Sequence, residues 1–182
     1  LPVADEPGDA IGEVGFANLY PAFSPDGKYL AYISNKKGDY FSSSSLYLYD
    51  LATKKERRVI AGVRSNFSWS PDARTIYYSK NTRDNPFWSS YYDIFAVDVE
   101  SGDEKRITEG LRSNAPAVSP DGQRIAFVSG SDGTLNLFTM RTDGTGLQQL
   151  TRYDSGQQVY NPAWSPDGAT IVLDFSVKDG RD

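Results

Sequence analysis

The sequence predicts an all-β fold, namely a β-propeller of four-stranded antiparallel blades, and three observations lead to this prediction. A Ser-Pro-Asp triplet recurs four times, at intervals of 46, 49 and 46 residues. Each triplet is flanked by short alternating segments typical of strands, and no helical period of useful length competes with them. The chain also holds 12 Tyr and 9 Phe, which pack well on strands. A period of about 40–50 residues with several strands per repeat indicates propeller blades.

The triplet is predicted to form the turn between the first two strands of each repeat. Pro sets φ at the first central position, and the Asp side chain can bond nearby backbone groups. A glycine follows in three repeats and can adopt positive φ there. Ala73 takes this place in the second repeat, so we expect that turn to be strained or differently formed. The triplets begin at Ser24, Ser70, Ser119 and Ser165.

The first strand of each repeat ends at the triplet, in a bulky apolar residue preceded by a small one. Such residues lie on opposite faces of a strand, and the small ones suit an innermost strand near a central axis. Four antiparallel strands then make one blade. The first strands are predicted at 20–23, 66–69, 115–118 and 161–164; the second at 29–34, 75–79, 124–129 and 170–175; the third at 46–50, 93–98 and 136–141; and the fourth at 56–60, 104–108 and 147–151.

The repeats divide the chain into three complete blades and a partial fourth. The blades are predicted at 18–62, 63–110 and 111–158, with the partial blade at 159–182 and residues 1–17 as possible outer strands of a shared blade. Three arrangements stay open: the two termini join in one blade, the chain belongs to a larger ring, or two copies complete one ring. We favour the larger ring, because the first residue is Leu rather than Met and the last repeat stops after two strands.

Composition excludes several classes of function. The net charge is −5 and no basic stripe is present, so we expect no nucleic-acid partner. No apolar run approaches the length of a membrane helix, so we expect no membrane insertion. The chain has no His and no Cys, which excludes a Ser-His-Asp triad, a thiolate nucleophile and His- or Cys-ligated metal sites within it. Ca²⁺ in an Asp-rich loop is the one cofactor with any support, although no matching loop pattern is present.

Several segments resemble one repeat family. Residues 143–151 and 161–168, and likewise 21–27 and 93–98, look like the repeat of TolB-like β-propellers, also described as PD40 or WD40-like repeats. The resemblance covers residues 18–175. It implies a periplasmic or cell-surface location and a role in holding other proteins.

Blade connectivity predicts a candidate partner-binding face. Loops between the second and third strands share one rim with the segments that enter the next blade, opposite the Ser-Pro-Asp turns. Aromatic residues and Arg on such a rim suit contact with a protein or a glycan. The alternative is that Phe87, Trp88 and Tyr92 fold back to cover their own blade. The candidate residues are Tyr40, Phe41, Arg64, Asn66, Phe87, Trp88, Tyr91, Tyr92, Arg112 and Asn114.

The sequence therefore predicts a non-catalytic propeller of the bacterial cell envelope that binds a protein or peptide partner or acts as a scaffold. One alternative is an accessory propeller of a peptidase, of the prolyl oligopeptidase or metallopeptidase kind, whose catalytic domain lies outside these residues. Another is a propeller enzyme that acts on saccharides through carboxylates.

Overall fold

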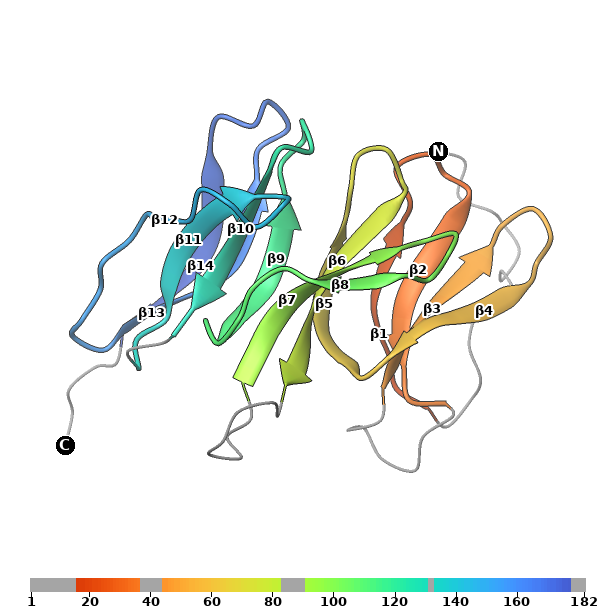
Figure 1. The fold of residues 1–182 in the computed structure, drawn as a ribbon, viewed down its shortest axis with the longest axis horizontal. Helices are drawn as coiled ribbons and strands as arrows, with labels where there is room; N and C mark the ends of the chain where they lie inside the picture. Colours follow the sequence, from red (N-terminus) through yellow and green to blue (C-terminus); the bar gives the residue numbers. More distant parts are fainter. Residues whose placement is uncertain (1–15, 37–43, 83–90, 131–132, 178–182) are drawn as a thin grey trace, which may run out of the picture.

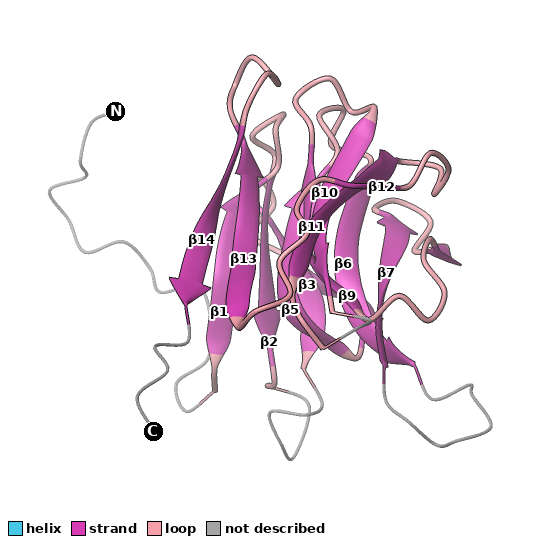
Figure 2. Cartoon of the chain, turned by 90° about the vertical axis from the view of Figure 1, so that its left-hand side faces the viewer, coloured by secondary structure: helices cyan, strands magenta, loops and turns pink. Residues whose placement is uncertain are grey.

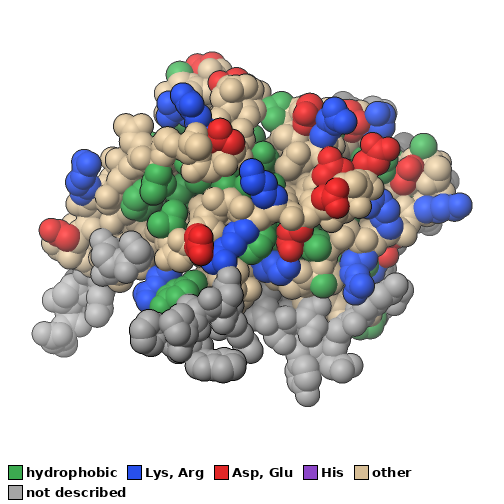
Figure 3. Space-filling view, in the orientation of Figure 1, with side chains coloured by type: hydrophobic (Ala, Val, Ile, Leu, Met, Phe, Trp, Pro, Cys, Tyr) green, Lys and Arg blue, Asp and Glu red, His purple; other side chains and the backbone are tan. Residues whose placement is uncertain are grey.

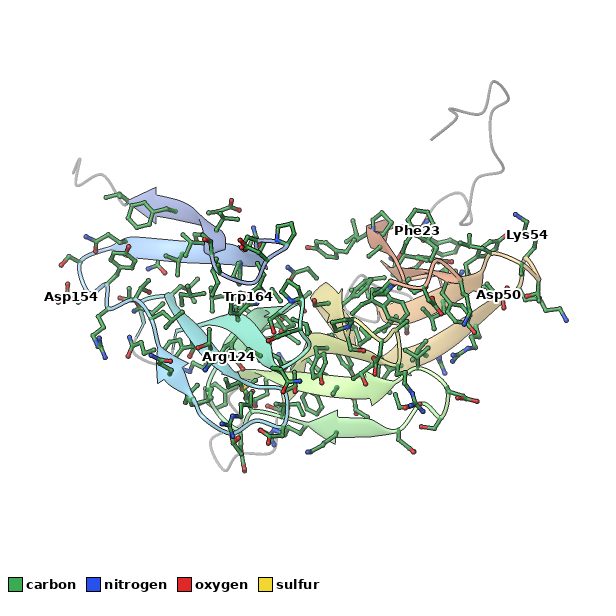
Figure 4. All side chains as sticks on the ribbon, turned by 90° about the horizontal axis from the view of Figure 1, so that it is seen from above. Phe23, Asp50, Lys54, Arg124, Asp154 and Trp164 are labelled. Atoms are coloured by element: carbon green, nitrogen blue, oxygen red, sulfur yellow. The ribbon has the colours of Figure 1, made fainter. Side chains whose placement is uncertain are left out.

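The computed structural model describes residues 16–36, 44–82, 91–130 and 133–177. Strands, turns and loops make up this part of the chain (Figure 2), and it holds no helix that could cross a membrane. Four sheets follow one another along the chain and form an open arc of blades (Figures 1 and 4). The predicted propeller fold, with three complete blades and a partial fourth, is confirmed.

Each complete blade is a sheet in which sequence neighbours pair antiparallel, and its first strand lies at the inner edge. The first blade contains β1 (Asn18–Phe23), β2 (Tyr29–Ser34), β3 (Ser45–Asp50) and β4 (Glu56–Ala61). The second contains β5 (Val63–Trp69), β6 (Thr75–Thr82), β7 (Tyr91–Asp98) and β8 (Glu104–Arg106). The third contains β9 (Ser113–Val118), β10 (Arg124–Ser129), β11 (Asn136–Arg141) and β12 (Gln148–Gln149), and the partial blade contains β13 (Gln157–Trp164) and β14 (Ile171–Val177).

The outer strands β8 and β12 are shorter than the sequence predicts. At the end of β8 the N–H groups of Ile107 and Thr108 both donate to the carbonyl oxygen of Ile94, at 2.8 and 3.2 Å. Two consecutive donors on one acceptor form a bulge, which interrupts the regular ladder. Leu150 and Thr151 share an acceptor in the same way beyond β12.

The four anchor turns, one at each Ser-Pro-Asp triplet, have the same construction. In the first, the Ser24 hydroxyl donates to Asp26 Oδ1 at 2.6 Å and accepts from the Tyr29 N–H at 2.9 Å. Ala73 has φ +59°, close to the +72° of Gly27, and its N–H closes the same bond to the triplet serine. The second turn is therefore strained but not differently formed.

Hydrogen bonding in the anchor turns lowers the pKa of their aspartates. The Ser24 hydroxyl is the main cause that holds the pKa of Asp26 at about 2, and the triplet serine lowers the pKa of Asp72, Asp121 and Asp167 in the same way. A carboxylate whose pKa is lowered by folding stabilises the protein above its unfolded pKa, and this contribution is lost as pH falls through the folded pKa.

We therefore expect the free energy of unfolding to fall as the pH is lowered from about 4 to about 2. Urea unfolding at a series of pH values measures this dependence. Replacing the four triplet aspartates by Asn removes the titrating groups and should flatten the curve in this window. The control variant Glu109→Gln, outside the turns, should keep the wild-type slope, and equal slopes for all three proteins would contradict the assignment.

The core lies between blades, because both faces of a central blade are covered by its neighbours. Ala31 and Ile33 of the first blade pack with Ile76 and Tyr78 of the second, and corresponding clusters join the later blades. The small residues of the inner strands permit close contact. The hydroxyl of Ser68 accepts from the Val118 N–H at 3.0 Å, which ties one inner strand to the next.

Candidate binding rim at the channel mouth

The inner strands β1, β5, β9 and β13 all change register part-way along their length. We call the end of the blades opposite the anchor turns, where the chain enters each inner strand, the entry rim. Positive φ occurs at Tyr20 (55°), Ala115 (53°) and Asn161 (47°), each of which precedes a proline. Proline cannot donate to a ladder, and a bulge redirects the side chain beside it. In three of the four repeats the residue before this proline is therefore turned at the bulge.

These bulges form a pocket of about 280 Å³ at the mouth of the axial channel. All four inner strands contribute to it, and Tyr92 at the start of β7 completes the lining. None of the described residues that line it is charged. The mouth pocket is lined by Tyr20, Ser65, Asn66, Tyr92, Asn114, Ala115 and Asn161.

Three of the predicted binding residues meet in this pocket: Asn66, Tyr92 and Asn114. Asn66 lies in a strand, as the predicted range 66–69 has it, whereas the expected location of Tyr92 and Asn114 in loops is wrong. Asn66 and Asn114 lie in the inner strands β5 and β9, while Tyr91 and Tyr92 lie in β7, opposite residues 82 and 81 of β6. The hydrogen-bonded ladder between β6 and β7 therefore extends further than the alternation of apolar and polar residues in the sequence indicates.

The remaining candidates have different outcomes. Arg112 places its guanidinium carbon 4.7 Å from the centroid of the Tyr91 ring, which makes a cation–π pair at the rim. Arg64 lies in β5, and only its place in the strand is described. Tyr40, Phe41, Phe87 and Trp88 lie outside the described residues.

A buried carboxylate supports this part of the rim and was missed by the sequence analysis. Asp93 is fully buried at the start of β7 and accepts from the Arg106 guanidinium at 2.7 Å and the Thr108 hydroxyl at 3.0 Å. It also accepts from the backbone N–H groups of Gly110 and Leu111, at 3.2 and 3.3 Å. Asp93 thereby holds the segment that leads to Arg112 and β9.

In the third blade a side-chain amide takes the role of the Asp93 carboxylate. Asn136 holds the place of Asp93, since each opposes the same position of the preceding strand. Its Oδ1 accepts from the Tyr153 N–H at 2.8 Å and its Nδ2 donates to the Tyr153 carbonyl at 3.0 Å. A polar residue at the start of the third strand therefore fixes the chain that enters the next blade.

The axial groove continues from the mouth pocket along the inner strands. Its volume is about 480 Å³, and its lining is mostly proline, aromatic and small residues, including Phe67, Trp69 and Trp164. Asn66 lines both the groove and the mouth pocket. The two spaces therefore form one path from a polar mouth to an apolar channel wall.

The anchor end of the first two blades carries a different cavity, of about 550 Å³, which is lined by residues of both charges. Figure 3 likewise shows acidic and basic side chains interspersed over this side of the molecule. Within the described part of the chain, no three His, Cys, Asp or Glu side chains group as a metal site.

Both ends of the arc leave apolar side chains exposed. Phe23 is 65% exposed, whereas Trp69 at the same repeat position is 9% exposed. Val172 of β14 is 61% exposed, whereas its counterparts Ala31 and Ala126 are fully buried against a following blade. Figure 4 labels Phe23 on the first blade and Trp164 on the partial blade at the two sides of the opening. Each end thus presents the kind of face that blades elsewhere in the chain bury.

Comparisons with known proteins give consistent results. The model of the PD40 family, described as the TolB beta propeller domain, matches residues 6–181. The uncharacterised protein Atu1656 of Agrobacterium fabrum is 33% identical over 178 residues, which cover 95% of this chain and 57% of that protein. The Tol-Pal system protein TolB of Francisella tularensis is 30% identical over 155 residues, covering 84% of this chain and 34% of TolB.

The chain is also similar to a peptidase and to a solved structure of TolB. The uncharacterised peptidase YuxL of Bacillus subtilis is 32% identical over 115 residues, covering 62% of this chain and 17% of the peptidase. The crystal structure of TolB from Acinetobacter baumannii aligns with a TM-score of 0.72 at 24% identity, over 91% of this chain and 39% of that one, which shows a shared fold. The chain spans between about a sixth and somewhat over half of the lengths of these relatives.

Proposed function

The chain belongs to the TolB β-propeller domain family, and we propose on this basis that it is a non-catalytic protein-binding or scaffolding propeller of the bacterial cell envelope. Its location would be the periplasm or the cell surface, and its partner a protein or peptide. The relative whose name places it in the Tol-Pal system supports this proposal. No cofactor is assigned.

The observation that carries the proposal is the construction of the entry rim. The Tyr91 and Arg112 side chains form a cation–π pair there, and Asp93 fixes the segment that leads into the third blade. Tyr and Arg are enriched among residues that dominate protein interfaces, because they combine a large contact area with directed polar groups. The backbone that carries these side chains is therefore ordered before a partner binds. This reduces the conformational entropy lost on binding.

Binding to the Pal component of the Francisella tularensis Tol-Pal system, immobilised on a biosensor, is the test. We expect saturable binding that Tyr91→Ala and Arg112→Ala each weaken by about tenfold, the loss typical of an interface hot spot. Arg124→Ala is the matched control, because this exposed arginine lies at the anchor end of β10. Equal losses in all three variants would contradict a role for the entry rim, and the absence of binding by the wild-type chain would contradict the partner class.

The second candidate is an accessory propeller of a peptidase. Its support is the similarity to the peptidase YuxL, of which this chain covers only 17%. A catalytic domain would have to lie outside these residues, because the chain has no His for a Ser-His-Asp triad. A hydrolase motif in sequence adjoining the propeller would favour this candidate over the first.

We further propose that the arc is part of a larger ring. The exposed faces at Phe23 and Val172 correspond to faces that other blades bury, so each can receive another blade. Further blades of a longer propeller are the favoured completion, and a second copy of the chain is the alternative. Light scattering distinguishes them for the isolated chain, since the second copy predicts a defined dimer instead of a particle of 20.1 kDa.

A further inference from the structure

The mouth pocket contains polar groups that the protein leaves without partners. Among the described residues, the side-chain amides of Asn66 and Asn114 and the hydroxyls of Tyr20 and Tyr92 make no hydrogen bond within the chain. Ser65, by contrast, is engaged, since its hydroxyl donates to the carbonyl of Asn66 at 2.9 Å and accepts from the Ser79 N–H at 3.1 Å. The pocket therefore has a lining side chain held by hydrogen bonds within the chain, and several lining side chains whose donors and acceptors are available to a ligand.

The chemistry of these groups selects the kind of ligand. An amide side chain and a phenol each offer both a donor and an acceptor. A sugar hydroxyl also donates and accepts, so a ring with neighbouring hydroxyls can satisfy both functions of one amide. No lysine, arginine, aspartate or glutamate is among the lining residues that the structure describes. A charged ligand would lose its hydration there without gaining a counter-ion.

The pocket also offers aromatic surface. Tyr20 is 47% exposed, and Tyr92 is half-buried at the start of β7. A tyrosine ring presents an apolar face beside a polar hydroxyl, which matches a pyranose ring with its C–H face and its equatorial hydroxyls. The volume of about 280 Å³ lies at the lower end of the range for ligand pockets and suits one or two sugar rings.

The backbone at the pocket is strained where the lining residues are placed. Tyr20 and Asn161 have positive φ, which costs free energy for residues with a Cβ atom. Asn161 is further fixed by its side chain, whose Nδ2 donates to Asp174 at 2.8 Å. Strain of this kind gathers at sites where side chains must be held in place for a ligand.

We propose that the mouth pocket binds a short neutral saccharide, with the tyrosine rings against the sugar face and the Asn66 and Asn114 amides on its hydroxyls. This goes beyond the proposed protein partner, because the ligand occupies the mouth pocket rather than the part of the entry rim that carries Tyr91 and Arg112. The pocket is expected to discriminate against uronic acids, since no cation is among its described lining residues.

Ligand-observed NMR titration of the whole chain tests the proposal, with cellobiose and maltose as neutral probes and digalacturonate as an anionic probe of similar size. We expect at least one neutral disaccharide to saturate the chain with a Kd on the order of 1 mM, and digalacturonate to bind at least about tenfold more weakly. Asn66→Ala and Asn114→Ala should each raise the Kd by about fivefold, the loss of one neutral hydrogen bond. Tyr92→Ala should raise it further, while Tyr92→Phe keeps the ring and should lose only the hydroxyl contribution.

Gln123→Ala is the matched control, because this exposed amide lies in the third anchor turn at the opposite end of the blade. No saturation by either neutral probe at up to about 30 mM would overturn the proposal. So would tighter binding of digalacturonate, binding of a neutral Gly-Ser peptide in place of the saccharides, or equal effects of Asn114→Ala and Gln123→Ala. The protein partner is tested independently, because the Pal assay uses Tyr91 and Arg112, which do not line this pocket.

Discussion

Replacing Asp93 by Ala is expected to lower the free energy of unfolding by about 3–5 kcal/mol. Asp93 is fully buried and ion-paired with Arg106, whose guanidinium would lose its carboxylate partner in a partly buried site. The N–H groups of Gly110 and Leu111 would also lose their acceptor. Removing one member of a buried pair costs more than the pair contributes, because the other member stays desolvated. Urea unfolding followed by tryptophan fluorescence measures the loss.

Asp93→Asn is the control, because the third blade uses Asn136 at the corresponding position. An amide keeps one acceptor for the entry segment but removes the charge opposite Arg106. We expect its cost to be about 1–3 kcal/mol, smaller than that of Asp93→Ala. A loss below about 1 kcal/mol for Asp93→Ala would show that the carboxylate does not support the entry rim.

The anchor turns could be predicted because their causes are local. Ser24, Pro25 and Asp26 form their turn through bonds within a few residues, and the same bonds recur wherever the triplet does. The strand order then follows from short connections between antiparallel neighbours. The positive φ of Ala73 shows how firmly the surrounding sheet imposes this turn on a residue that does not favour it.

The mouth pocket could not be predicted in the same way, because its residues meet through bulges in four separate strands. Tyr20 was left out of the candidate residues for this reason. The sequence does hold a usable signal. Tyr20, Ala115 and Asn161 each lie four residues before their triplet serine and directly precede a proline. A proline inside a strand indicates an edge or a bulge, and here both apply.

The network of Asp93 was missed for a different reason. Its partners Arg106, Gly110 and Leu111 belong to the end of one blade and the entry to the next. The alternation of apolar and polar residues assigns Asp93 to the start of a strand. It does not show that the segment leading into the next blade packs beside Asp93. The count of carboxylates in the sequence likewise cannot separate this buried one from the solvated ones in turns.

Replacing Trp69 by Ala is expected to cost about 3–5 kcal/mol, the range for truncating a buried Trp. Trp69 packs in the core between the first and second blades together with Leu48, Tyr78 and Val97. Phe23→Ala is the matched control, because Phe23 holds the same repeat position at the open end of the arc and is 65% exposed. We expect its cost in the isolated chain to stay within about 0.5 kcal/mol. Urea unfolding of both variants at two protein concentrations gives the comparison.

The concentration dependence of this pair separates the two ways of completing the ring. If a second copy covered Phe23, wild-type stability would rise with protein concentration through mass action, and Phe23→Ala would lose that increment. If further blades of a longer propeller cover Phe23, both proteins stay concentration-independent, and the small cost of Phe23→Ala becomes large only in the longer chain. A small cost for Trp69→Ala would contradict the core assigned between the first and second blades, because Trp69 is a large buried member of that cluster.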